Sequence, residues 1–220
     1  MAPIGKIYTY PNNFRVQRAQ ALAALNGHEI EIDPAFVFGK TNKTPEFLAK
    51  FPMGKTPAFE SADGFCLAEG HAICRYAADS GPNSGQLLGS DAKARARVEE
   101  WSCFAEHELV AHMMPPLYMC VLHIAPFDEA RYAQSVASLE RALKRLAVAL
   151  ADGRKFLVGD HVSMADVMVA GPLMILGKHL MDREMRALVP SVVEYLKGLL
   201  EIPEVGNAFE ALELCEVRVR

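Results

Sequence analysis

The feature that most constrains the fold is a proline at the entrance to a short apolar strand. Pro57 follows Thr56 and precedes the apolar pair Ala58-Phe59. Because proline has no N–H to give to a sheet ladder, a strand that begins there must lie at a turn or an edge. The Thr56-Pro57 bond is then either trans, as most such bonds are, or cis. A cis bond would leave the main-chain N–H and C=O of Thr56 free to pair with another peptide.

A carboxylate precedes the next helical segment. Glu69 stands before the apolar positions Ala72, Ile73, Tyr76 and Ala77, whose spacing predicts a helix. Glu69 is then either a helix cap or part of a binding site, since a carboxylate beside free N–H groups can hold an ammonium and a carboxylate together. This layout is suited to a small peptide rather than a nucleotide.

The first part of the chain alternates between strand and helix patterns. Lys6 to Tyr10 predicts a strand, Val16 to Asn26 a helix that ends at Gly27, and Glu29 to Ile32 a second strand. This is a βαβ opening. The turn-forming run 79–86 predicts a linker after it.

The second part of the chain predicts helices only. Apolar residues recur at three- and four-residue steps from Val136 to Leu150, as on the buried face of a helix. Ser163 and Asp166 are spaced as a capping box at the start of another apolar helix, so we assign them to folding rather than chemistry.

Composition excludes several classes of function. The net charge is -4 and the basic residues are scattered, which argues against a nucleic-acid partner. No segment is long and apolar enough for a membrane span, and we expect no secretion signal, since the first residues lack a cationic segment followed by an apolar run. Five cysteines without paired spacing indicate reduced thiols, so we expect a cytoplasmic protein.

Six segments, in this order and spacing, resemble the glutathione transferase family, particularly the transferase-like domain of the gamma subunit of eukaryotic translation elongation factor one. They are residues 7–15, 38–47, 54–59, 63–66, 156–159 and 214–216. The resemblance implies an α/β plus all-α fold. A thioredoxin-like glutathione-binding domain would occupy residues 1–81, and an all-helical domain that supplies the second-substrate pocket would occupy residues 91–220.

The same resemblance implies that glutathione is the cofactor or co-substrate. The residues that it assigns to glutathione are Asn42, Lys43, Lys55, Thr56, Pro57, Glu69, Gly70 and His71. The lysines and Asn42 match positions that hold the glycine carboxylate, Thr56 matches the partner of the cysteinyl backbone, and Glu69 matches the γ-glutamyl anchor. Relatives usually have serine after that glutamate, so Gly70 removes one hydroxyl.

Thiol activation needs a donor near the start of the first helix, because a free thiol with a pKa near ~8.5 is mostly protonated at neutral pH. The segment offers Tyr8, Tyr10, Asn13 and Arg15, among others. We take Arg15, Asn13 and Tyr8 as catalytic candidates. Asn13 either donates to the sulfur or caps the helix, and Tyr8 either donates or is buried in its strand.

The second-substrate pocket is expected along the first long helix of the helical domain. Its candidates are Phe104, His107, Glu108, His112, Met113 and Tyr118, which either line that pocket or pack between domains. His107 and His112 are five residues apart and so lack the i, i+4 spacing of a helical zinc pair. We therefore expect no metal.

Two functions stay open. One is a transferase that joins glutathione to a small apolar or conjugated electrophile, or that isomerises a double bond by reversible addition. The other is a non-catalytic assembly module that docks elongation factor subunits. The sequence ends at Arg220 without a Lys-rich linker, which favours the enzyme. We also expect a homodimer that uses the surface of residues 60–104.

Overall fold

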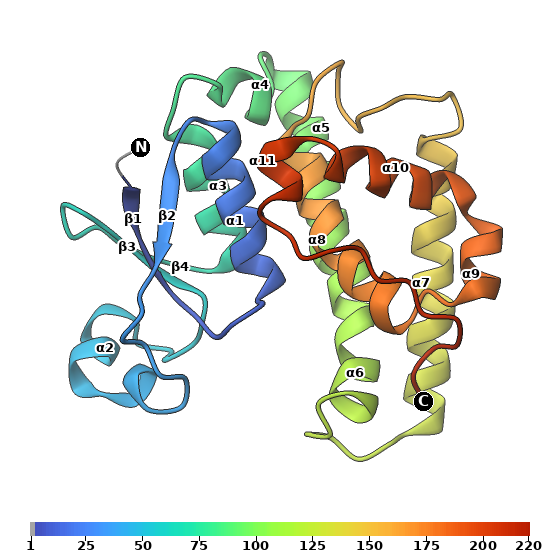
Figure 1. Cartoon of the computed structure of the whole chain (residues 1–220), viewed down its shortest axis with the longest axis horizontal. Coiled ribbons are helices and arrows are strands. Elements are labelled where there is room, and N and C mark those ends of the chain that lie inside the picture. The colour runs from blue at the N-terminus through green and yellow to red at the C-terminus, as the bar shows by residue number, and fades with distance from the viewer. Residues whose placement is uncertain (1–2) are drawn as a thin grey trace.

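The computed structural model describes residues 3–220 and contains a four-stranded sheet beside a set of helices (Figure 1). The strands are β1 (Pro3–Tyr8), β2 (Glu29–Ile32), β3 (Ala58–Ser61) and β4 (Cys66–Ala68). Their order in the sheet is β2-β1-β3-β4, with β1 parallel to β2 and antiparallel to β3, and β3 antiparallel to β4. The predicted βαβ opening and the predicted strand at Ala58 are therefore confirmed.

Helices cover both faces of this sheet. The helices α1 (Phe14–Leu25) and α3 (Gly70–Asp79) pack on the face that holds Ile7, while η1 (Thr41–Lys43) and α2 (Pro45–Lys50) lie beside the opposite face. Successive strand residues point to opposite faces, so Tyr8 packs with Phe47 and Phe51 on the α2 side. The Thr44 hydroxyl caps α2 by accepting the Phe47 N–H.

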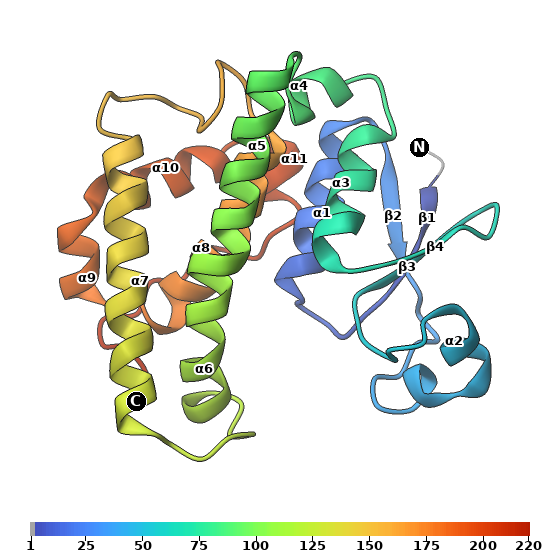
Figure 2. The same cartoon turned by 180° about the vertical axis from the view of Figure 1, so that it is seen from behind.

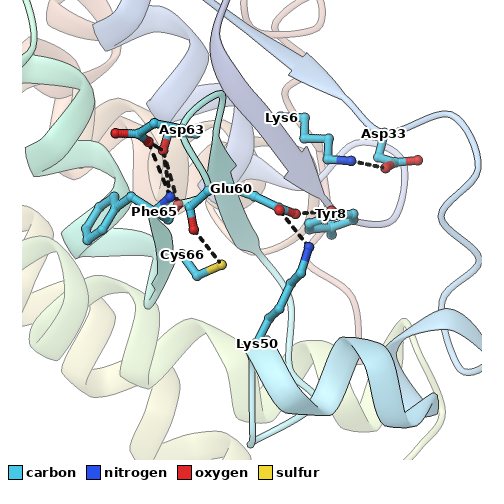
Figure 3. Close-up of polar contacts among 10 residues, drawn as sticks. Lys6, Tyr8, Asp33, Lys50, Glu60, Asp63, Phe65 and Cys66 are labelled. Carbon is cyan, nitrogen blue, oxygen red and sulfur yellow. Dashed lines mark hydrogen bonds and ion pairs between the residues drawn. The ribbon is translucent and has the colours of Figure 1, made fainter.

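On the α2 face, Glu60 of β3 is held by two donors (Figure 3). The Tyr8 hydroxyl donates to Glu60 Oε2 at 2.5 Å, and the Lys50 ammonium donates to Glu60 Oε1 at 2.6 Å. The Lys50 bond, followed by the Tyr8 bond, holds the pKa of Glu60 below its ordinary value of 4.5. This network ties α2 to the sheet.

The rest of the chain is helical. The helices are α4 (Ser84–Leu88), α5 (Ala92–Phe104), the π-helix η2 (Ala105–Val110), α6 (Ala111–Cys120), α7 (Glu129–Ala149), α8 (Met164–His179), α9 (Arg183–Leu188), α10 (Pro190–Leu200) and α11 (Pro203–Gly206). Figure 2 shows α5, η2 and α6 as one continuous rod that faces the sheet domain, with α7 on the side of the rod away from that domain. The predicted linker over 79–86 is partly wrong, because α4 begins at Ser84 and buries Leu87 and Leu88 in the core.

The start of α8 is fixed by a buried carboxylate. Asp166 accepts hydrogen bonds from the N–H and the hydroxyl of Ser163, both at 2.8 Å, from the Leu157 N–H at 2.8 Å and from the Tyr195 hydroxyl at 2.6 Å. Burial raises the pKa of Asp166, although every one of these bonds favours the carboxylate. The predicted capping box is therefore present and also anchors α10 through Tyr195.

One buried arginine joins the two parts of the molecule. Arg18 of α1 is fully buried, with its Nη2 2.5 Å from Glu106 Oε1 of η2 and its Nη1 donating to the Met168 carbonyl of α8 at 3.2 Å. A methyl group at Gly171 would stand 2.7 Å from Arg18 Cδ, so glycine is needed there to admit the side chain. The helical domain is thus fixed against α1.

The Glu60 network predicts a pH-dependent contribution to stability. Because the pKa of Glu60 is lower in the folded chain than in the unfolded one, its bonds stabilise the fold above about pH 4.5 and are lost as pH falls through the folded pKa. We expect Glu60→Gln to lower the urea midpoint at pH 7, with a difference from wild type that shrinks from about pH 5 to pH 3. Glu29→Gln, on an exposed residue of β2, is the control. A constant difference down to pH 3 would contradict the prediction.

Candidate functional site

The backbone at Glu69 is strained. Its φ is 70°, a left-handed value that a residue with a side chain rarely adopts, and it stands immediately before α3. The carboxylate makes no capping hydrogen bond to α3, so the simple capping role considered for Glu69 is not what the structure shows. Such strain commonly marks functional positions. The side chain is exposed and stands beside the first N–H groups of α3.

Glu69 lines a cleft of about 470 Å³ between the two domains. The residues of this cleft are Arg15, Glu69, Gly70, His71, Glu99, Cys103, Glu106 and His107. They come from the N-terminal turns of α1 and α3 on one side, and from α5 and η2 on the other. The cleft is therefore complete only when the two domains are packed together.

The side chain of Arg15 crosses the start of α3. A Cβ placed on Gly70 would lie 3.3 Å from Arg15 Cδ and 3.4 Å from its Cβ. The guanidinium lies over the Phe14 ring, 4.6 Å from its centroid, and its charge opposes the rise that burial causes in the pKa of Tyr10. Gly70 thus leaves room for the Arg15 side chain. The Arg15 guanidinium extends from the start of α3 toward the loop between β1 and α1.

The opposite wall of the cleft is acidic and is shaped by the π-helix. Glu106 keeps one oxygen on Arg18 and lines the cleft, with 23% of its side chain exposed. Glu99 of α5 pairs with His71 at 3.1 Å and with Arg75 at 3.7 Å, which links α5 to α3. Burial, and then the charge of Glu99, raise the pKa of the Cys103 thiol. A π-turn inside a long helix often lies at a functional site.

The Thr56-Pro57 bond is cis. Neither the N–H nor the C=O of Thr56 makes a hydrogen bond with another residue in the range 3–220. Lys43 and Lys55 are exposed, and within that range no carboxylate forms an ion pair with either. Their role in binding glutathione stays a prediction.

Asn42 does not fit the role that the family resemblance implies. It is 6% exposed, its Oδ1 accepts the Gly39 N–H at 2.6 Å, and its Nδ2 donates to the Gly54 carbonyl at 2.7 Å. Both polar ends are occupied in joining two loops. The predicted contact of Asn42 with glutathione therefore stays a prediction.

The side chains of two catalytic candidates already make hydrogen bonds within the protein. Asn13 caps α1 by accepting the Arg15 N–H at 3.1 Å, its amide donates to Thr9 Oγ1 at 3.1 Å, and only 3% of the residue is exposed. Tyr8 is 8% exposed, with its hydroxyl on Glu60 at the α2 face. Of the three candidates, Arg15 alone lines the cleft.

The structure separates the residues proposed for the second substrate. His107 lines the cleft, but Met113 is fully buried in the core and Phe104 packs edge-on against Trp101 at 5.1 Å. Glu108 and His112 do not line the cleft. Glu108 lies 3.8 Å from His112 and 3.9 Å from Arg141 of α7, so these two residues belong to the α6–α7 side.

Tyr118 lies further along the same rod. It is 37% exposed near the end of α6. Together with Phe104, Glu108, His112 and Met113, it lies outside the cleft that holds Glu69 and Arg15.

Sequence reasoning missed the acidic wall. Glu99, Cys103 and Glu106 are spaced by four and three residues, which places them on one helix face with His107, so the signal was present. In the part of the chain that the structure describes, no helix is long and apolar enough to cross a membrane, and no cluster of three potential metal ligands is found.

Comparisons with known proteins agree with this architecture. The model of the glutathione S-transferase N-terminal domain matches residues 3–79, and the model of the glutathione S-transferase C-terminal domain matches residues 129–198. The glutathione S-transferase-like protein LUC7 of Fusarium sp is 44% identical over 218 residues, which cover 99% of this chain and 98% of that protein.

Two further matches extend the comparison. Elongation factor 1-gamma of Artemia salina is 36% identical over 96% of this chain, which spans 48% of that protein. The structure of glutathione S-transferase I from maize, solved with an atrazine glutathione conjugate, superposes with a TM-score of 0.80 at 25% identity, covering 94% of this chain and 96% of the maize chain. From the matched domain models, the full-length relatives and the shared fold, this chain belongs to the glutathione transferase family.

Proposed function

We propose that this chain is an enzyme that binds glutathione and transfers it to a small apolar or conjugated electrophile. The observation that carries the proposal is Glu69, held with a φ of 70° in a cleft beside the α3 N-terminus. Strain at a residue whose carboxylate makes no capping hydrogen bond to its own helix is best explained by a ligand that uses the carboxylate.

The γ-glutamyl end of glutathione suits the start of α3. Its ammonium would meet the Glu69 carboxylate, and its own carboxylate would meet the main-chain N–H groups of Gly70 and His71, where the helix dipole favours a negative charge. The cysteinyl backbone would pair with Thr56, and the exposed Lys43 and Lys55 would face the glycine carboxylate. The family membership and the conjugate bound by the maize relative support the same ligand.

In this proposal Arg15 activates the thiol. Its guanidinium is carried past Gly70 toward the β1–α1 loop, and a bond from a cation to a thiolate is roughly twice as strong as a neutral one. The sulfur then attacks the electrophile. If addition to a conjugated double bond is followed by rotation and loss of glutathione, the net result is isomerisation.

A second candidate is a non-catalytic assembly module that binds elongation factor subunits. The similarity to elongation factor 1-gamma over 96% of this chain supports it. The full-length match to LUC7, a glutathione S-transferase-like protein, supports the enzyme. We place the enzyme in the cytoplasm, since its five cysteines are all free.

The first test concerns Glu69. Glu69→Ala should weaken glutathione binding in calorimetry by about 2 kcal/mol, roughly thirtyfold, because the ligand ammonium loses its charged partner. Glu69→Gly should lose the same affinity while being more stable than Glu69→Ala in thermal unfolding, because glycine tolerates the φ of 70°. Unchanged affinity in both variants would refute the site.

The second test concerns Arg15. Arg15→Ala should lower turnover of a reactive aryl halide by about tenfold to a hundredfold with little change in glutathione affinity, because the cation acts on the charged sulfur. The ultraviolet absorbance of the bound thiolate should fall in parallel. Arg131→Ala, at an exposed position of α7, is the control. If Tyr8→Phe abolishes the thiolate signal and Arg15→Ala preserves it, Tyr8 is the donor. If the wild type shows neither the thiolate absorbance nor turnover of the aryl halide, the non-catalytic assembly module is the favoured function.

The third test concerns assembly. We propose that the surface of residues 60–104 meets the helical domain of a second copy, giving a homodimer with closed twofold symmetry. Sedimentation at micromolar concentration should show a species twice the 24.2 kDa mass of the chain. A single 24.2 kDa species would exclude the dimer at that concentration.

A further inference from the structure

Most of the large apolar side chains that this protein exposes lie at one edge of the molecule, which we call the apolar edge. Nine of the fourteen exposed in residues 3–220 belong to segments 32–55 and 118–127. In Figures 1 and 2 both segments lie at the edge away from α4. Scattered apolar side chains are normal on a surface, but a concentration of them marks an interaction site. The nine are Ile32, Val37, Phe38, Leu48, Met53, Tyr118, Leu122, Ile124 and Phe127.

The helical domain contributes the loop after α6, residues 121–127, which we call the α6 tip. From Met113 to Phe127 the sequence has no aspartate, glutamate, lysine or arginine. Within the tip, Leu122 is 54% exposed and Ile124 is 70% exposed. Turns on a protein surface usually carry small or polar residues. A turn that holds bulky apolar side chains outward is therefore suited to an apolar partner.

The main chain of the α6 tip is largely bonded within the protein. His123 takes a left-handed φ of 52°, and the chain on either side of it folds back onto α6. Pro126 has no N–H. Because little water is left at the boundary between lipid headgroups and acyl chains, bonded N–H groups lower the cost of placing the tip there. The bonds run at 2.8–3.3 Å from the N–H groups of Val121 and Leu122 to the Leu117 carbonyl, and from those of Ile124 and Ala125 to the Tyr118 carbonyl.

The sheet domain makes the other half of the apolar edge basic. Segment 32–55 has four lysines against two carboxylates, Asp33 and Glu46, although the whole chain has a net charge of -4. Asp33 is paired with Lys6 at 3.4 Å. A lysine stem can lie along apolar surface while its ammonium reaches an anion. The edge is therefore complementary to a surface that is apolar beneath and anionic outside. The lysines are Lys40, Lys43, Lys50 and Lys55.

We propose that the apolar edge binds reversibly to a bilayer that contains anionic phospholipids. The α6 tip enters the boundary between headgroups and acyl chains, where Leu122, Ile124 and Phe127 leave water. The lysines of segment 32–55 face the phosphates and direct the edge to an anionic rather than a neutral bilayer. None of the nine apolar side chains lines the cleft or belongs to residues 60–104, the surface proposed for the dimer. The inference is independent of transferase activity.

Flotation with vesicles tests the proposal. The wild type should float with vesicles of phosphatidylcholine and phosphatidylserine mixed three to one. Ile124→Asp should lower its partition coefficient by at least about tenfold, because a side chain that leaves water is replaced by a carboxylate. Lys40→Ala should lower it by about fivefold, and by less with phosphatidylcholine alone. Val148→Asp is the matched control, since Val148 is 72% exposed at the far end of α7, and it should float like the wild type.

A fluorescent side chain locates the tip. Trp101 is the only tryptophan in the sequence and is 6% exposed, so its emission should change little when vesicles are added. Ile124→Trp should add an emission that shifts to shorter wavelength with the mixed vesicles and is quenched by brominated lipid. Val148→Trp should show neither effect.

Several results would overturn the membrane assignment. They are a wild type that does not float with the mixed vesicles, equal flotation of wild type and Ile124→Asp, and equal losses in Ile124→Asp and Val148→Asp. A wild type that ignores vesicles but self-associates in sedimentation, in a way that Ile124→Asp abolishes, would show that the edge joins copies of the chain instead. No assay here contains glutathione, so each of these outcomes leaves the proposed function standing.

Discussion

The ion pair between Arg18 and Glu106 is the contact on which the site depends. A fully buried arginine is costly unless its charge is paired and its N–H groups are bonded, and breaking such a pair costs about 3–5 kcal/mol. Here the partners of the α1 guanidinium come from η2 and from the Met168 carbonyl of α8. A shift of the helical domain against α1 would leave the charge unpaired. The pair therefore fixes the spacing of the two walls of the cleft.

The same pair orients the acidic wall. Glu106 is bound through one oxygen and faces the cleft with part of its side chain, while Glu99 is bound by His71 and Arg75 from α3. Both carboxylates are thus positioned by residues of the sheet domain. Carboxylates and cationic groups therefore line the same cleft, with Glu99 and Glu106 on one side and Arg15 on the other.

Glu69 and Gly70 show how local backbone and side-chain packing are matched. The φ of 70° at Glu69 persists because β4 and α3 hold the segment on either side. The stem of Arg15 passes so close to Gly70 that a Cβ placed there would lie 3.3 Å from Arg15 Cδ. Glycine at this position therefore leaves room for the Arg15 side chain beside the start of α3.

The amino-acid sequence by itself determined the βαβ opening, the strand at Ala58, the capping box at Ser163 and the family, because these follow from short-range periodicity and motif spacing. Tertiary structure decided which side chains line the cleft. Glu106 faces the cleft while Glu108 turns to α7, and Arg15 lines the cleft while the Tyr8 hydroxyl is bound to Glu60. The direction of each group depends on partners distant in the chain, such as Arg18 for Glu106, and on the π-turn that rotates the helix. The spacing of residues within one segment of the sequence does not identify those partners.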